Sequence, residues 1–239
     1  MSPETEPAGS CTVNLAPCTV SHGDSMPRID DYKQALRLAS DQLKDKDPEV
    51  LAGLSGAVTG RDKEGCKTLV LDALNQRVSL TWPDLAFVSA TPEAEIPIQQ
   101  QILYLHYLCG AWSSKGAKAT GEWISFQEIP DGRFYMDAFQ RRAKNPMVMT
   151  FGEKPDLLLK VATELYGAVP FNQGDVSVVV RALPLVPVAL ILWKGDEEFP
   201  PEGNVLFDRS VIGILSAEDV AWLSGMVVYP MIGRAKIKG

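Results

Sequence analysis

Histidine is almost absent from this chain of 239 residues, which contains only His22 and His106. His22 lies in a polar N-terminal segment, so a histidine-rich metal site or a Ser-His-Asp triad would depend on His106 alone. The short signatures of common active sites are also missing: G-x-S-x-G, H-E-x-x-H, C-x-x-C, G-x-G-x-x-G and the Walker loop. No enzymatic activity can therefore be inferred from a sequence motif.

Cysteine is scarce as well, and the four residues present are too few for a disulfide scaffold in a chain of this length. Cys11 and Cys18 lie near the N-terminus. Cys66 opens a predicted apolar strand and Cys109 lies in a predicted apolar helix, positions at which a buried, reduced thiol is expected.

Long apolar runs and clustered basic residues are lacking too. No run reaches the length of a membrane span, and the N-terminus has no signal-peptide pattern. The net charge is −7 and the pI is near 5.0, with tight basic groups only at Arg141-Arg142 and in the C-terminal tail. Nucleic-acid binders need clustered Lys and Arg, so we expect no nucleic-acid partner, no membrane partner and a cytoplasmic location.

What is present is the composition of an ordinary globular protein, 46% hydrophobic and 22% charged. Residues 1–27 are rich in Pro, Ser, Thr, Glu and Gly without a repeating apolar face, which predicts a disordered tail. Residues 28–239 are predicted to form a single α+β domain, with an antiparallel or mixed sheet and about five helices.

The predicted elements alternate irregularly along the chain, which favours α+β over a βαβ winding. Predicted helices lie at residues 30–44, 96–112, 135–148, 155–166 and 216–223. Asn145-Pro146 is a candidate break in the helix at 135–148, and the helix at 155–166 ends at Gly167. The helix at 216–223 begins with a Ser216/Asp219 capping box and ends before Gly225. Predicted strands lie at residues 67–74, 77–82, 123–129, 176–183, 186–193 and 205–207. Pro187 indicates an edge strand or a bulge.

Three groups of residues are candidates for a functional site. His106 lies in an apolar helix and can serve as the single axial ligand of a tetrapyrrole metal, or simply as a hydrogen-bonded core histidine. With Cys109 at i+3 it would supply only two of the four ligands of a zinc site.

The second group is aromatic and basic: Trp123, Tyr135, Arg141 and Arg142 could line a pocket for a planar, carboxylated ligand, because arginine recognises carboxylates with a bidentate fork. The same spacing is typical of a core-facing helix, with Asp137 and Arg141 as a surface pair.

The third group is the acidic loop between two apolar strands. Asp196, Glu197 and Glu198, followed by Glu202, could act as acid/base groups or bind a hard metal ion. A solvated surface loop is the alternative. The prolines of this loop restrict its conformation, and loops held in a defined conformation often carry functional residues.

Three blocks carry a resemblance to a known family: LYLHYL, GEWISFQEIPDGRFYMDAFQRR followed by TFG, and LPLVPVALILWKGDEEFPPEGNVLFD. Over residues 30–233 the chain resembles an uncharacterised domain family of anaerobic bacteria and archaea. The resemblance implies a setting rich in corrinoid, sirohaem and iron–sulfur chemistry. Some members carry a four-cysteine cluster segment. Here only Cys11 and Cys18 precede the domain, so that segment is not matched.

These observations lead to three hypotheses. The first is a non-catalytic protein of anaerobic metabolism that binds a haem-like tetrapyrrole or cobalamin through His106 and the aromatic and arginine group. The second is a hydrolase or transferase that uses the carboxylates of the 196–202 loop, with or without a metal ion. The third is an accessory protein that binds a protein partner and no small ligand.

Overall fold

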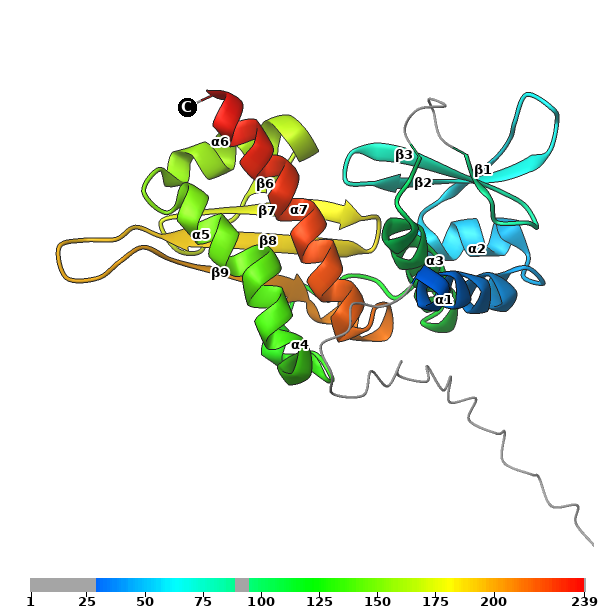
Figure 1. Ribbon diagram of the computed structural model, residues 1–239, viewed down its shortest axis with the longest axis horizontal. Coiled ribbons are helices and arrows are strands. Elements are labelled where there is room, and N and C mark those ends of the chain that lie inside the picture. The colour runs from blue at the N-terminus through cyan, green and yellow to red at the C-terminus, as the bar shows by residue number, and fades with distance from the viewer. Residues whose placement is uncertain (1–28, 89–94, 239) are drawn as a thin grey trace, which may run out of the picture.

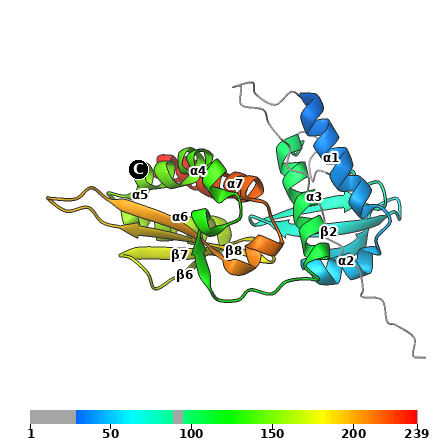
Figure 2. The ribbon, with the colours of Figure 1, turned by 90° about the horizontal axis from the view of Figure 1, so that it is seen from below.

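The computed structural model describes residues 29–88 and 95–238. They form two antiparallel sheets, each with its own helices (Figures 1 and 2). The predicted disorder of residues 1–27 falls outside the described residues. The strands are β1 (Val58–Arg61), β2 (Lys67–Ala73), β3 (Gln76–Thr81), β4 (Phe87–Val88), β5 (Trp123–Ser125), β6 (Val169–Pro170), β7 (Val176–Leu183), β8 (Val186–Trp193) and β9 (Glu202–Asp208). The helices are α1 (Ile29–Leu43), α2 (Pro48–Ser55), α3 (Ile98–Ser113), α4 (Gly132–Phe139), α5 (Asn145–Phe151), α6 (Pro155–Tyr166) and α7 (Ala217–Lys238).

The first sheet has the order β1-β2-β3-β4 and lies beside α1, α2 and α3. The predicted strands 67–74 and 77–82 are confirmed as β2 and β3, which form a hairpin whose turn is Leu74-Asn75. Both turn residues have positive φ, 49° and 61°, as two-residue hairpins of the type I′ class require. Cys66 precedes β2 and is exposed, contrary to prediction, whereas Cys109 is buried as expected.

Helix α2 was not assigned from the sequence, although a local signal for it exists. The Asp47 carboxylate accepts hydrogen bonds from the N–H groups of Glu49 and Val50, and Pro48 occupies the first helical turn. An Asp-Pro pair is a favourable helix start because Pro has no N–H to leave unpaired there.

The second sheet has the order β5-β9-β8-β7-β6. The predicted strands 176–183 and 186–193 are confirmed with the same bounds as β7 and β8, which pair antiparallel. Pro187 lies on the central strand β8, so the edge-strand interpretation is wrong. The bulge alternative is correct, because the register shifts between Arg181, opposite Pro187, and Leu183. Strand β5 is shorter than predicted, since a 3₁₀ turn at Phe126–Glu128 follows it, capped by Ser125 and Glu128.

Helices α4, α5 and α7 lie along one face of this sheet (Figure 2). The predicted break at Asn145-Pro146 does not occur. A π-helical turn, Gln140–Lys144, joins α4 to α5, and the Asn145 N–H bonds to the Gln140 carbonyl five residues back. We attribute the tolerance of Pro146 to the wider turn, since a proline within a regular helix clashes with the carbonyl four residues earlier.

Helix α7 continues far beyond the predicted end near Gly225 and contains Pro230. Its inner face is fully buried, so packing overrides the weak helix preference of glycine and proline. Pro230 cannot donate to the carbonyl of Met226. The Tyr166 hydroxyl, on α6, instead lies 2.8 Å from the Val227 carbonyl and 3.5 Å from that of Met226.

One contiguous core joins the two sheets into an α+β domain, as predicted. The Tyr107 hydroxyl, on α3, donates to the Ser55 carbonyl at 2.5 Å and accepts from the Leu185 N–H at 3.2 Å, in the β7–β8 turn. The Leu74 N–H bonds to the Ala182 carbonyl of β7. Among the described residues no helix combines the length and apolar character needed to cross a membrane.

Candidate functional site

A histidine–carboxylate pair joins α3 to the start of α7. His106 Nδ1 lies 2.8 Å from Asp219 Oδ1, and the two side chains are 34% and 12% exposed. An ionised carboxylate only accepts hydrogen bonds, so Nδ1 is the donor. The pair fixes one ring nitrogen inside the protein and leaves part of the ring at the surface.

Asp219 is itself held by the helix start. The Ser216 hydroxyl donates to Asp219 Oδ2 at 2.7 Å, and the Asp219 N–H donates to the Ser216 hydroxyl at 3.2 Å. The predicted capping box is thus confirmed. The Asp219 carboxylate has two functions: Oδ2 caps α7, and Oδ1 orients His106.

A glycine on α3 allows this approach. Gly110 lies one helical turn after His106, on the same face. A Cβ at Gly110 would lie only 1.9 Å from the backbone oxygen of Ile214, in the segment that leads into α7. No side chain fits there, so Gly110 lets the beginning of α7 lie directly on α3.

Residues of α4 and the π-helical turn complete the site. The Tyr135 hydroxyl donates to Glu218 Oε2 at 3.3 Å. The Arg142 guanidinium lies over the ring of Trp222, 4.5 Å from its centroid. Through Glu218 and Trp222, the first two turns of α7 bring His106, Tyr135 and Arg142 together, although they come from three different segments.

The carboxylates change the protonation of their neighbours. Burial opposes protonation of His106, but the hydrogen bond to Asp219 and the charges of Asp219 and Glu218 outweigh it and raise the His106 pKa. Desolvation and the adjacent Asp219 raise the pKa of Glu218, although its side chain is exposed at the surface. Burial and three carboxylates, those of Glu218, Asp131 and Asp219, raise the Tyr135 pKa to about 12.

Two of the predicted cofactor-binding residues lie outside this cluster. Trp123, on β5, packs against Phe171 with ring centroids 5.1 Å apart. Arg141 forms an exposed ion pair with Asp137 at 2.8 Å, the surface pair considered from the sequence. Glu218 and Trp222 were not identified from the sequence, and Asp219 was identified only as a capping residue.

The acidic loop lies at the exposed end of the β8–β9 hairpin, away from helix α3, which carries His106 (Figure 1). Asp196 Oδ1 accepts hydrogen bonds from the N–H groups of Glu198 and Phe199, both at 2.8 Å, and these bonds lower the Asp196 pKa. That carboxylate therefore stabilises a turn. Across residues 29–88 and 95–238, no group of three or more His, Cys, Asp or Glu side chains is arranged to hold a metal ion.

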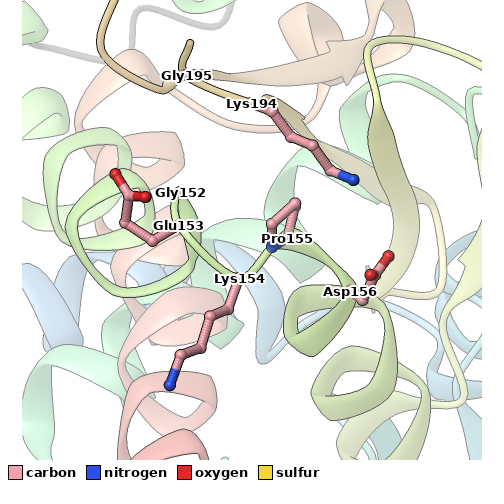
Figure 3. A pocket seen from close by; sticks show the side chains of 7 residues that line it. All are labelled: Gly152, Glu153, Lys154, Pro155, Asp156, Lys194 and Gly195. Carbon is pink, nitrogen blue, oxygen red and sulfur yellow. The ribbon is translucent and has the colours of Figure 1, made fainter. Parts of the chain in front are cut away.

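A shallow depression of about 390 Å³ lies at the base of this loop, between Lys194-Gly195 and the segment 152–156 (Figure 3). The Lys154 side chain points away from Lys194 (Figure 3). A second depression, of about 470 Å³, lies between the starts of α1 and α3. His106 lines neither of them.

The fold and this cluster define an α+β protein with a histidine–carboxylate site where α3, α4 and α7 meet. The family model described as Domain of unknown function (DUF3786) matches residues 47–229, and the chain belongs to this family. The match includes every residue of the cluster and confirms membership of an uncharacterised domain family. No curated protein and no solved structure matches the chain.

Proposed function

We propose that the protein binds a planar, metal-centred cofactor of the tetrapyrrole or corrinoid type, with His106 as the single axial ligand from the protein. In this proposal the chain is a binding protein and performs no catalysis. The cofactor would supply the redox or ligand-exchange chemistry of its metal. The residues of the chain would bind, orient and partly shield it.

The observation that carries the proposal is the 2.8 Å contact between His106 Nδ1 and Asp219, on a ring that keeps 34% of its side chain exposed. Histidines that bind metals usually donate their other ring N–H to a carboxylate or carbonyl, which fixes the ring and raises its basicity. With Nδ1 held by Asp219, Nε2 is the nitrogen left for a metal. Among the described residues no hydrogen bond of Nε2 is found.

The surroundings suit one axial bond better than a metal ion held by several side chains, because no such multidentate set exists among the described residues. A planar group on His106 would lie on the exposed part of the imidazole, beside the start of α7, whose Glu218 and Trp222 contact Tyr135 and Arg142. Neither surface depression includes His106, so the cofactor would be held against a surface instead of inside a closed cavity.

The test is spectroscopic. Protein purified without oxygen should show a Soret or corrin absorption band, or should acquire one when haemin or a cobinamide is added at micromolar concentration. His106→Ala should remove or shift the band, and circular dichroism should show that helix content is kept, since Ala is a good helix former.

Two control variants sharpen the test. His22→Ala removes the only other histidine of the chain and should leave the band unchanged. Asp219→Asn keeps the side-chain size but weakens the hold on Nδ1, and should lower affinity by about 10- to 100-fold, the effect of losing a partner of a ligating histidine. If neither cofactor binds the parent protein, the proposal is wrong.

A further inference from the structure

The first sheet has an open edge at β1. This strand pairs with β2 on one side, and among the described residues no strand pairs with it on the other. The N–H of Asp62, which follows β1, donates to the carbonyl of Cys66, just before β2. Hydrogen bonding alternates along an antiparallel pair, so Gly60 also bonds to β2. The N–H and C=O groups of Thr59 and Arg61 therefore point away from the sheet.

Strand β1 lacks the features that usually protect such an edge. Edge strands are commonly blocked by a proline, by a bulge or by being very short. Strand β6, at one edge of the second sheet, contains Pro170, and β4, at the other edge of the first sheet, has two residues. Strand β1 has no proline, its register with β2 is regular, and its Val58 is 64% exposed. Its outer backbone groups are accessible to another strand.

The charges beside this edge complement a second copy of the chain. Thr59 and Arg61 are two residues apart, so their side chains share one face of the strand. Glu49, on α2, lies on that face, because its Oε2 accepts a hydrogen bond from the Thr59 hydroxyl at 2.6 Å. If two β1 strands pair antiparallel about a two-fold axis at Gly60, Thr59 lies opposite the Arg61 of the second copy. That arginine then lies beside Glu49.

Both charged groups can make this contact. The Arg61 guanidinium donates to a neutral group, the Gly65 carbonyl, at 2.8 Å. Glu49 Oε1 lies 3.1 Å from Lys67 Nζ, and the Glu49 side chain is 58% exposed. A carboxylate has about four acceptor sites, so Glu49 can bind an arginine as well. Gly60 has no side chain, and a glycine within a strand often marks the close approach of another backbone.

We propose that two copies of this chain pair β1 with β1, antiparallel and about a two-fold axis, so that the first sheet continues from one copy into the other. The Arg61 of each copy binds Glu49 of the other, as the symmetry of such an interface requires. Opposite charges across a strand pair stabilise it, and like charges directly opposite each other destabilise it. This inference does not depend on the proposed function.

The experiment measures self-association of the full chain by analytical ultracentrifugation over a range of concentrations. The parent should show a monomer–dimer equilibrium. Arg61→Glu and Glu49→Arg should each weaken dimerisation at least about tenfold, because every dimer contains the altered contact twice. An equimolar mixture of the two variants should restore the dimer, since each charge in the heterodimer again faces one of opposite sign.

Two further variants locate the effect. Arg77→Glu makes the same charge change at an exposed arginine of the same sheet, 3.4 Å from Asp72, and should leave association unchanged. Thr59→Pro removes an N–H that points away from β2, so it should keep the first sheet intact and still weaken dimerisation at least about tenfold. Circular dichroism of each variant verifies that the fold is kept.

Several results would overturn the proposal. One is a parent that stays monomeric at about 100 μM, where a dimer with a micromolar Kd would form. Another is a dimer that Arg61→Glu leaves unchanged, or that Arg77→Glu weakens equally. Hydrogen exchange distinguishes a further case: if the Thr59 and Arg61 N–H groups are protected in a monomer, another segment of the same chain covers β1, and the proposal is wrong.

Discussion

Gly110→Ala should separate α3 from the start of α7. The added Cβ would lie 1.9 Å from the Ile214 carbonyl oxygen and 2.6 Å from its carbon. Carbon and carbonyl oxygen in contact stay about 3.3 Å apart or more, so one backbone must move by about 1.4 Å. The obstacle is backbone, which cannot rotate away as a flexible side chain can.

Overpacking a core typically costs about 1–3 kcal/mol. Because neither backbone can yield locally, we expect Gly110→Ala to lose about 3 kcal/mol or more of unfolding free energy. For a chain of this size that corresponds to a fall in melting temperature of roughly 6–12 °C. The same movement should pull Asp219 away from His106, so the raised His106 pKa should fall toward its ordinary value of about 6.5.

Gly53 provides the matched control, since it lies in α2 and a Cβ there would meet nothing within 4 Å. Gly53→Ala should be neutral or stabilise by about 0.5–1 kcal/mol, because Ala favours the helix. Urea and thermal unfolding measure stability, and NMR titration of the imidazole measures the His106 pKa. A Gly110→Ala protein with the stability of the parent and an unmoved His106 pKa would refute the argument that this glycine holds the site together.

Two further predictions concern hydrogen bonds that support the scaffold. Asp208 is buried and accepts hydrogen bonds from the Thr120, Gly121 and Ser210 N–H groups; burial opposes ionisation, but these bonds outweigh it and lower the pKa. Asp208→Ala should therefore lower the free energy of unfolding in urea by about 2–4 kcal/mol at pH 7. The stabilisation by Asp208 should be fully present above about pH 4 and should disappear as the pH falls through the lowered pKa of Asp208. If the parent and the Ala variant differed in unfolding free energy as much at pH 2 as at pH 7, this prediction would be contradicted. Tyr166→Phe should lower the free energy of unfolding by about 1–2 kcal/mol, because the Met226 and Val227 carbonyls lose their hydrogen-bond donor. If the loss were no larger than for a Phe substitution at an exposed tyrosine, water would have replaced the Tyr166 hydroxyl as the donor.

The sequence predicted best what depends on neighbouring residues. The bounds of β7 and β8 follow from two Val- and Leu-rich runs around a tight turn. The capping box of α7 is predicted by the spacing of Ser216 and Asp219. The end of α7 could not be predicted, because burial of one helix face carries it through glycine and proline. Local preference is weak compared with packing.

The site was predicted only in part, for the same reason. His106, Tyr135 and Arg142 were each identified, but so were Trp123 and Arg141, which are aromatic and basic like Tyr135 and Arg142 and lie outside the cluster. The partner of His106 is 113 residues away along the chain. Helix spacing reports which residues share a face, and it carries no information on which other helix will lie against that face.

The π-helical turn between α4 and α5 sets the rotation of α5 about the helix axis relative to α4. The buried residues Phe139, Ala143, Met147 and Phe151 are spaced by four, whereas a regular α-helix repeats every 3.6 residues. Over three such steps a regular helix would rotate the last side chain about 120° from the first, and the wider turn absorbs part of that drift. Deleting one residue between 140 and 144 would restore a regular helix and turn α5 by about 100° relative to α4. A change in the length of this turn therefore changes which face of α5 points into the core. In any homologue that lacks one residue here, we expect substitutions either in the core residues of α5 or in the contact between Arg142 and α7.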